Sequence, residues 1–245
     1  MTRTALREPL QAGEHRLVAR WRDKLTERGI DFDGPQMPDE VDVQPALDAA
    51  QARIPFDYQD AVADHPVVAA WVAKVAATAV ADNRGGRGRR AISHGPSLLL
   101  WGPTGTGKTR QAYGAIRALT TAGCGVAWEA VFTANLYAEM RPRPGVDPEW
   151  MLRRYMRAPV LLLDDLGLPK HTPWNEELTG RLLNYRAERH LPTIVTTNLP
   201  PIRTPGMPAQ QEVLRDKIGD RVLSRLAGMC VQVELNGPDR RYLRA

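Results

Sequence analysis

Apolar residues come in short runs between residues 97 and 235, most of them continuous, and stretches with helical spacing separate these runs. Runs of this kind are typical of strands buried on both faces of a parallel sheet, since a half-exposed strand alternates apolar and polar positions. We therefore predict strands at Ser97–Trp101, Val126–Ala130, Val160–Leu163, Thr193–Thr197 and Val231–Leu235. This pattern predicts an α/β fold, a parallel sheet flanked by helices.

The residues before this region favour helices. Residues 14–29 carry apolar side chains at every fourth position and end in Gly29, which predicts an amphipathic helix. The stretch 31–45 is acidic and rich in proline. A second helix is predicted from Pro66 to about Ala81, because proline is tolerated in the first turn of a helix. We expect a small helical N-terminal module.

A basic loop divides the chain. Asn83-Arg-Gly-Gly-Arg-Gly-Arg-Arg90 has no apolar residue, and its glycines keep the backbone loose. The predicted organisation is a helical partner-binding module over 1–50, a linker region with one helix and this loop over 51–90, and the α/β domain over 91–245.

Composition and charge narrow the classes of protein. Hydrophobic residues make up 43% of the 245 and charged residues 25%, which is ordinary globular usage. The first 83 residues hold 9 Lys and Arg against 14 Asp and Glu, whereas the remainder holds 24 against 14. A basic part joined to an acidic part suggests a polyanion for one and another partner for the other.

Several classes are excluded or disfavoured. Two cysteines, Cys124 and Cys230, cannot form a disulfide framework or a four-ligand zinc site. The longest apolar run, residues 67–81, is interrupted by Lys74 and is too short to span a bilayer. The first twenty residues lack the apolar stretch of a signal peptide, so we expect a cytoplasmic protein.

One motif carries specific chemistry. The segment after the first predicted strand fits the phosphate-loop pattern G-x-x-x-x-G-K-[ST], and a helical stretch follows it. Its backbone N–H groups and the positive end of the helix would hold ATP phosphates, with Lys108 at the β- and γ-phosphates and the Thr109 hydroxyl on Mg²⁺. The predicted nucleotide-binding residues of this loop are Gly102, Pro103, Thr104, Gly105, Thr106, Gly107, Lys108 and Thr109.

Two further strand ends bear polar residues. The run Val160–Leu163 is followed by Asp164 and Asp165. In phosphate-loop enzymes the first such acid holds Mg²⁺, and the second would orient and deprotonate the attacking water. Asn198 follows the strand 193–197 and could hydrogen-bond that water or the γ-phosphate. We therefore expect Asp165 and Asn198 to be catalytic and Asp164 to be a metal ligand.

The motifs together resemble the DnaC/IstB family of AAA+ ATPases. The resemblance rests on Gly-Pro-Thr-Gly-Thr-Gly-Lys-Thr, Leu-Leu-Leu-Asp-Asp-Leu-Gly, Leu-Pro-Thr-Ile-Val-Thr-Thr-Asn and Gly219-Asp-Arg-Val-Leu-Ser-Arg-Leu226, and it extends over roughly residues 53–245. It implies an AAA+ core that hydrolyses ATP with Mg²⁺. Members of this family load replicative helicases onto DNA or assist transposases.

The resemblance also implies residues that act between subunits. Arg225 matches the arginine finger that a neighbouring subunit receives at its γ-phosphate, and Arg221 would support the interface. Near the C-terminus, Arg240 and Arg241 stand where the family has a second sensor arginine, and the resemblance favours Arg241. Self-association with a shared ATP site is therefore expected.

Residues 133–157 are predicted to form two helical pieces joined by Pro142 and Pro144. By resemblance this insert approaches single-stranded DNA, and Trp150 and Tyr155 are expected to pack inward. The predicted DNA contacts are Arg141, Arg143, Arg153, Arg154 and Arg157.

The favoured function is an ATP-dependent helicase loader that binds single-stranded DNA, recognises the replicative hexameric helicase through its N-terminal module, and is released on hydrolysis. A transposition helper ATPase of the IstB type is the nearest alternative. A third is a nucleotide-dependent DNA-binding module in which Asp165 is too short to activate water. A phosphate-loop kinase is disfavoured, since no acceptor site is evident in the sequence.

Overall fold

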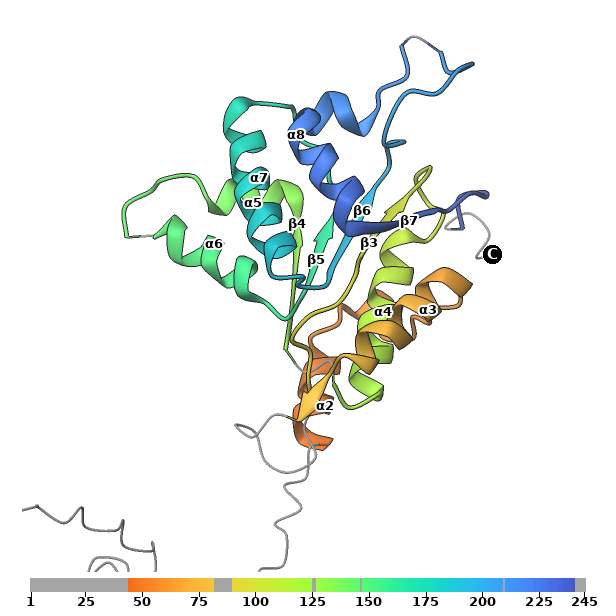
Figure 1. Ribbon diagram of the computed structural model, residues 1–245, viewed down its shortest axis with the longest axis vertical. Coiled ribbons are helices and arrows are strands. Elements are labelled where there is room, and N and C mark those ends of the chain that lie inside the picture. Colours follow the sequence, from red (N-terminus) through yellow and green to blue (C-terminus); the bar gives the residue numbers. More distant parts are fainter. Residues whose placement is uncertain (1–43, 82–89, 125–126, 146, 209, 241–245) are drawn as a thin grey trace, which may run out of the picture. The chain divides into compact units, whose positions relative to one another are not determined.

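A five-stranded parallel sheet lies at the centre of the structure (Figure 1), a computed structural model that describes residues 44–81, 90–124, 127–145, 147–208 and 210–240. The strands lie in the order β4-β5-β6-β3-β7, so β3 is flanked by β6 and β7. All pairings are parallel, which confirms the predicted α/β sheet. The strands are β3 (Ser97–Trp101), β4 (Trp128–Phe132), β5 (Val160–Asp164), β6 (Thr193–Thr197) and β7 (Cys230–Glu234).

The strand predictions differ in accuracy. The bounds of β3 and β6 are confirmed, and β5 extends one residue beyond the prediction, through Asp164. β7 begins one residue earlier than predicted. Val126, the start predicted for β4, lies outside the described residues, and β4 runs from Trp128, whose indole packs edge-on against Tyr113, to Phe132, two residues past the predicted end. Apolar runs therefore located all five strands, and side-chain packing set their ends.

Two hydrophobic clusters cover the two faces of the sheet. Leu98 and Leu100 of β3 belong to one cluster, and Leu99 to the other, as the alternation of side chains along a strand requires. Residues 160–163 of β5 are at most 1% exposed, and truncating a leucine buried this fully to alanine costs about 2–5 kcal/mol. Such continuous burial explains why β3 and β5 are apolar along most of their length, whereas the edge strand β7 is mostly exposed and contains Gln232 and Glu234.

The helices divide between these faces, as Figure 1 shows. One cluster joins the sheet to α2, α3 and α4, and the other joins it to α5, α6, α7 and α8. The helices are α2 (Gln44–Ala52), α3 (Pro66–Ala77), α4 (Lys108–Thr121), α5 (Thr133–Glu139), α6 (Pro148–Arg157), α7 (Pro173–Glu188) and α8 (Leu214–Met229), with a short 3₁₀ helix η2 (Phe56–Tyr58). Helix α4, which follows the loop after β3, and the insert helices α5 and α6 therefore cover opposite faces of the sheet.

The segment before β3 is part of the same core. Ile54 and Trp71 are each 2% exposed, and the indole N–H of Trp71 donates to the Pro96 carbonyl across 2.8 Å. A methyl group on Gly114 of α4 would lie 2.5 Å from the Val62 carbonyl carbon, so only glycine allows residues 62–63 to approach this helix. The described residues belong to one compact unit spanning Val41–Ala245.

The domain boundaries at residues 50 and 90 stay a prediction. The helix predicted at 14–29 and the loop at 83–89 lie outside the described residues. The helix predicted to reach Ala81 ends at Ala77, where the Thr78 hydroxyl has the carbonyls of Val75 and His94 within hydrogen-bond distance. A two-stranded antiparallel sheet of β1 (Val80–Ala81) and β2 (Arg90–Ala91) follows. Within the described part of the chain, no helix has the length and apolar character needed to cross a membrane.

Candidate nucleotide-binding site

The loop 102–109 joins β3 to the start of α4. Gly102 has a φ of 141°, and a methyl group there would lie 2.2 Å from the Leu235 carbonyl oxygen, so only glycine fits beside the end of β7. Gly107, with a φ of 97°, precedes the first residue of α4. The first N–H groups of α4 therefore point out of the carboxyl end of the sheet, where a helix favours bound anions.

Lys108 lies inside this loop. Its Nζ donates to the carbonyl oxygens of Gly102 and Pro103 across 2.9 and 2.7 Å, and the residue is 6% exposed. The Thr106 hydroxyl also donates to the Pro103 carbonyl, across 2.9 Å. The loop is thus held by its own side chains, and to bind a phosphate Lys108 would have to leave these carbonyl oxygens.

Asp164 faces the first turn of α4. Its Oδ1 accepts hydrogen bonds from the hydroxyl of Thr109, across 3.1 Å, and from that of Thr196, across 2.6 Å. Its backbone carbonyl accepts from the hydroxyl of Thr133 across 2.9 Å. The structure therefore brings together the two residues that the sequence assigned to Mg²⁺, Thr109 and Asp164.

Asp165 and Asn198 are also in contact, although 33 residues separate them. Asn198 Nδ2 donates to Oδ1 of Asp165 across 2.7 Å. Asp165 has a φ of 58°, a left-handed conformation that aspartate tolerates better than most residues. Burial, and then the neighbouring Asp164 charge, raise the pKa of the Asp165 carboxyl above its ordinary value, while Lys108 opposes this rise. A raised pKa makes this carboxylate a better proton acceptor near neutrality.

Sequence reasoning missed Thr196 and Thr133. Thr196, 1% exposed, accepts from the Asp165 backbone N–H across 2.9 Å in addition to its bond to Asp164. The period of two along a strand was the available signal, because it places Thr196 on the side of Asn198. For Thr133, at the start of α5, no local pattern indicated a contact with Asp164.

The segment after β7 lies against the loop. The Arg240 N–H donates to the Gly105 carbonyl across 3.0 Å, and a methyl group on Gly105 would lie 2.0 Å from Cγ of Asp239. The Arg240 side chain is the neighbour that a methyl group on Gly107 would meet, at 3.6 Å. Arg241, the sensor favoured by resemblance, lies outside the described residues, and Arg240 is adjacent to the phosphate loop.

Arg221 and Arg225 lie on α8, on the face of the sheet away from α4. The Nε of Arg225 donates to Oδ1 of Asn184 on α7 across 2.7 Å. Both arginines line a groove of about 1280 Å³ between α7 and α8. They are not brought to the phosphate loop of their own chain.

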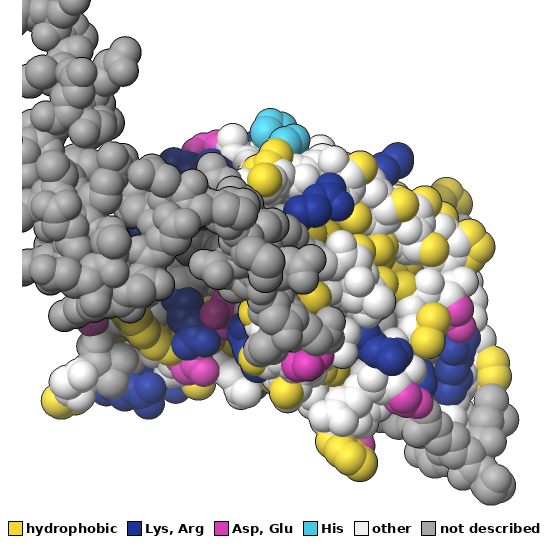
Figure 2. Space-filling model, turned by 90° about the horizontal axis from the view of Figure 1, so that it is seen from below, with side chains coloured by type: hydrophobic (Ala, Val, Ile, Leu, Met, Phe, Trp, Pro, Cys, Tyr) yellow, Lys and Arg dark blue, Asp and Glu magenta, His cyan; other side chains and the backbone are white. Residues whose placement is uncertain are grey.

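The five arginines of the insert are all exposed. The insert forms α5 and α6 as predicted, and Arg141 and Arg143 lie between these helices. Arg153 lies 3.5 Å from a carboxylate oxygen of Glu149, and Arg154 lies 2.8 Å from one of Glu129. On the face seen in Figure 2, the described Lys and Arg side chains lie in separate groups with acidic side chains between them.

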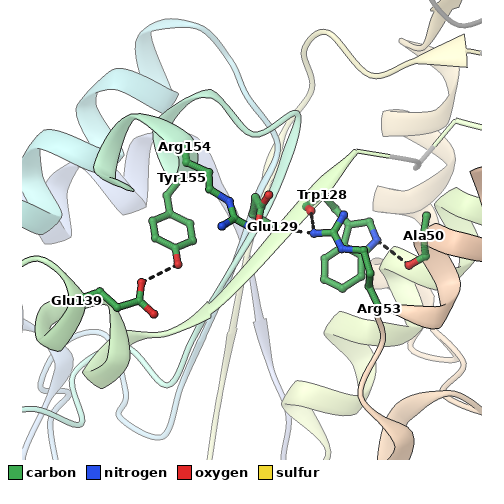
Figure 3. Close-up of polar contacts among 7 residues, drawn as sticks. All are labelled: Ala50, Arg53, Trp128, Glu129, Glu139, Arg154 and Tyr155. Atoms are coloured by element: carbon green, nitrogen blue, oxygen red, sulfur yellow. Dashed lines mark hydrogen bonds and ion pairs between the residues drawn. The ribbon is translucent and has the colours of Figure 1, made fainter. Parts of the chain in front are cut away.

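The aromatic residues of α6 differ from one another. Tyr155 is 5% exposed and its hydroxyl donates to Glu139 across 2.9 Å, so inward packing is confirmed for it (Figure 3). For Trp150 the prediction is wrong, since it is 61% exposed. The buried residues Leu152, Tyr155 and Met156 define one face of α6, and Trp150, two positions before Leu152, projects from another.

The donor set fits a magnesium nucleotide. The loop offers backbone N–H groups and one lysine to phosphates, and hydroxyl and carboxylate oxygens, the ligands that Mg²⁺ prefers, meet beside it. The Asp239 carboxylate lies at the same loop, where it would repel an anion. The residues present therefore fit ATP with Mg²⁺.

Comparison with known proteins supports this reading. The model of the family described as IstB-like ATP binding protein matches residues 87–243. An ATP-binding protein in an insertion sequence of Mycobacterium tuberculosis is 28% identical over 154 residues, which cover 62% of this chain and 58% of that protein. The replicative helicase loader DnaI of Bacillus subtilis is 28% identical over 97 residues, 38% of this chain and 31% of the loader. The chain thus spans less than two thirds of either relative.

A solved structure has the same fold. The crystal structure of the DnaC helicase loader superimposes with a TM-score of 0.56 at 22% sequence identity, covering 74% of this chain and 100% of that one. The fold is therefore the AAA+ phosphate-loop fold that the motifs predicted.

Proposed function

Because the chain belongs to the family of IstB-like ATP-binding proteins, we propose that it hydrolyses ATP with Mg²⁺ in an assembly of its own copies and uses this cycle to load a replicative helicase onto single-stranded DNA. The observation that carries the ATPase proposal is the meeting of Thr109 and Thr196 on one oxygen of Asp164, with Asp165 and Asn198 beside them.

Each residue has a defined task in this proposal. The loop N–H groups and Lys108 would bind the phosphates, and Thr109 and Asp164 would hold Mg²⁺, which neutralises charge on the phosphate oxygens. Asp165 would accept a proton from the attacking water, helped by its raised pKa. Asn198 would orient that carboxylate, since it already binds Oδ1.

The position of Arg225 supports a shared site. The arginine is exposed, and it contacts Asn184 on the α7–α8 side of the sheet, whereas the phosphate loop begins α4 on the other side. A finger at this place would serve the loop of a neighbouring copy, and Arg221, in the same groove, would support the contact. Isolated monomers would then hydrolyse ATP poorly.

Single-stranded DNA and a helicase are the proposed partners. Exposed arginines of the insert, with Trp150 exposed among them, offer charge for phosphates and a ring for stacking on bases. The similarity to the loader DnaI favours a replicative helicase as the protein partner. Recognition of that partner is assigned to residues 1–50, which are mostly outside the described residues.

A second candidate function follows from the relatives. The matching family model and the relative in an insertion sequence favour a helper ATPase of transposition, which would use the same ATP site with a transposase as partner and duplex DNA as substrate. The two candidates therefore share the nucleotide chemistry and differ in the DNA and protein that they bind.

Calorimetry tests nucleotide binding. Lys108→Ala should weaken ATP binding roughly 10- to 100-fold, because a hydrogen bond to a charged group is worth about 1.5–3 kcal/mol. Asp165→Asn should keep the affinity and lower turnover by about 10²–10⁴. Lys74→Ala, which removes an exposed lysine from α3, is the control. Equal affinity of wild type and Lys108→Ala would refute the assignment.

DNA-stimulated phosphate release separates the two candidates. A helicase loader should be stimulated more by an oligodeoxythymidine than by a duplex of the same length, and it should capture a purified replicative helicase. Stimulation by duplex DNA alone, with capture of a transposase, would select the transposition helper. Activity on neither DNA would contradict both.

A further inference from the structure

We infer that Thr196 positions both acids of the ATP site, a role that rests on the proposed function. Its hydroxyl donates to Oδ1 of Asp164 across 2.6 Å and accepts from the backbone N–H of Asp165 across 2.9 Å. A hydroxyl has one proton to donate and two lone pairs. Thr196 thus makes both bonds at once, and a single side chain determines where two successive acids lie.

The first bond bears on the metal. Oδ1 of Asp164 receives the Thr196 hydroxyl and the Thr109 hydroxyl, which orients the carboxylate toward the first turn of α4. Partners that orient a metal-binding carboxylate contribute about 10- to 100-fold to metal affinity. Thr196 would therefore act on Mg²⁺ through Asp164 without contacting it.

The second bond bears on the proton acceptor. Asp165 has a left-handed backbone with a φ of 58°, a conformation that persists only where its surroundings hold it. The Thr196 hydroxyl accepts from its N–H, and Asn198, which follows the last residue of β6, donates to its carboxylate. Together they direct the Asp165 side chain toward Asn198.

The neighbouring Thr197 does not contact either acid through its hydroxyl, so the positioning role is specific to Thr196. The hydroxyl of Thr197 donates to the Leu166 carbonyl across 2.7 Å and so acts on the turn beyond the acids. Thr196, 1% exposed, has no access to solvent that would let water replace its hydroxyl. Its removal should leave Asp164 and Asp165 without their shared contact.

The experiment titrates Mg²⁺ against the binding of a fluorescent ATP analogue. Thr196→Val keeps the shape and removes the hydroxyl, so the Mg²⁺ concentration for half-maximal binding should rise roughly 10- to 100-fold. Binding measured in EDTA should not change, because the phosphate loop is intact. At saturating Mg²⁺, KM for ATP should return to the wild-type value while kcat stays about 10- to 100-fold lower, since Asp165 is misplaced.

Two variants control for folding. Thr196→Ser keeps the hydroxyl and should restore the Mg²⁺ dependence. Thr179, on α7, is also 1% exposed, and its hydroxyl also has two partners, Tyr137 of α5 and the Asn175 carbonyl of α7; Thr179→Val removes that hydroxyl. It should titrate like wild type. If Thr196→Val does not fold, Thr196→Ala removes the same hydroxyl and takes its place.

The outcomes separate the two proposals. A wild type whose ATP binding does not depend on Mg²⁺ overturns the proposed function and this inference with it. If ATP binding by wild type depends on Mg²⁺ and Thr196→Val shows the same Mg²⁺ titration, only the role of Thr196 is overturned. An equal loss in Thr196→Val and Thr179→Val also overturns it, because the effect would then follow from lost packing.

Discussion

Nη2 of Arg154 on α6 donates a hydrogen bond across 2.8 Å to Oε2 of Glu129 on the edge strand β4 (Figure 3). The same carboxylate oxygen lies 3.6 Å from Nη2 of Arg53, whose guanidinium stacks over the Trp128 ring at 4.5 Å from its centroid. Glu129 thus ties the insert helix to the segment that precedes the sheet. In the proposed function, DNA bound at Arg154 would have to replace this carboxylate.

The arginines of α6 should therefore contribute unequally to DNA binding. Arg157→Ala should reduce the slope of log affinity against log salt by about 0.7, the value for one lost phosphate contact on a single strand. Arg154→Ala should reduce it less, and Glu129→Gln should strengthen binding up to about fivefold, since an exposed ion pair is worth about 1 kcal/mol or less.

Fluorescence anisotropy with labelled oligodeoxythymidine over a salt series measures these slopes. Lys74→Ala, which also removes one positive charge but on the α3 side of the sheet, serves as the control. A slope that is the same in Arg157→Ala and wild type would show that this face does not bind DNA.

A shared active site predicts complementation. Arg225→Ala should bind nucleotide normally, because Arg225 lies across the sheet from α4, and should lose hydrolysis by about 10³–10⁵, the effect of a finger in other phosphate-loop enzymes. Mixed with Lys108→Ala, it should regain part of the DNA-stimulated ATPase activity, since an intact loop can meet an intact finger. Mixed assemblies that form without any recovery would refute the finger assignment.

The raised pKa of Asp165 predicts a trade-off between stability and activity. A carboxyl whose pKa is raised by folding contributes stability below its unfolded pKa, and this contribution is lost as pH rises through the folded value. Asp165→Asn should therefore melt at a higher temperature than wild type at pH 7. The difference should shrink as pH falls toward about 4, the ordinary range of an aspartate.

Thermal denaturation of both proteins from pH 7 to pH 4 checks this expectation. Glu188→Gln, at an exposed position at the end of α7, should show no such pH-dependent gain. A wild type that is more stable than Asp165→Asn at pH 7 would contradict the proposed cost of ionising Asp165.

The Asp239 carboxylate should weaken the binding of ATP. It lies against Gly105 of the phosphate loop, so binding an anion there brings like charges together. Asp239→Asn should bind ATP about fivefold more tightly, because two unit charges about 4 Å apart in water repel each other by about 1 kcal/mol. Calorimetry at two salt concentrations measures it, and the gain should fall at high salt. Equal affinities at low salt would show that Asp239 moves away at no cost.

The sequence by itself determined the elements and the chemistry at their ends. Short apolar runs predicted all five strands, and in β3, β5 and β6 these runs reflect burial on both faces of the sheet. The phosphate loop follows one predicted strand and the two acids follow another. In a parallel sheet both strand ends lie at the same edge, so the sequence places the loop and the acids together. Asp164 and Thr109 could therefore be paired from their places alone, although 55 residues separate them.

Only the tertiary structure decided which further side chains contact Asp164 and the phosphate loop. Thr196 and Thr133 reach Asp164 because of strand register and helix packing, and Asp239 reaches Gly105 because β7 lies beside β3. Trp150 is exposed because of the rotation of α6 about its axis, which packing sets. These contacts join residues far apart in the chain: the period of two along β6 indicates the side on which Thr196 lies, but no local pattern identifies its partner or those of Thr133 and Asp239.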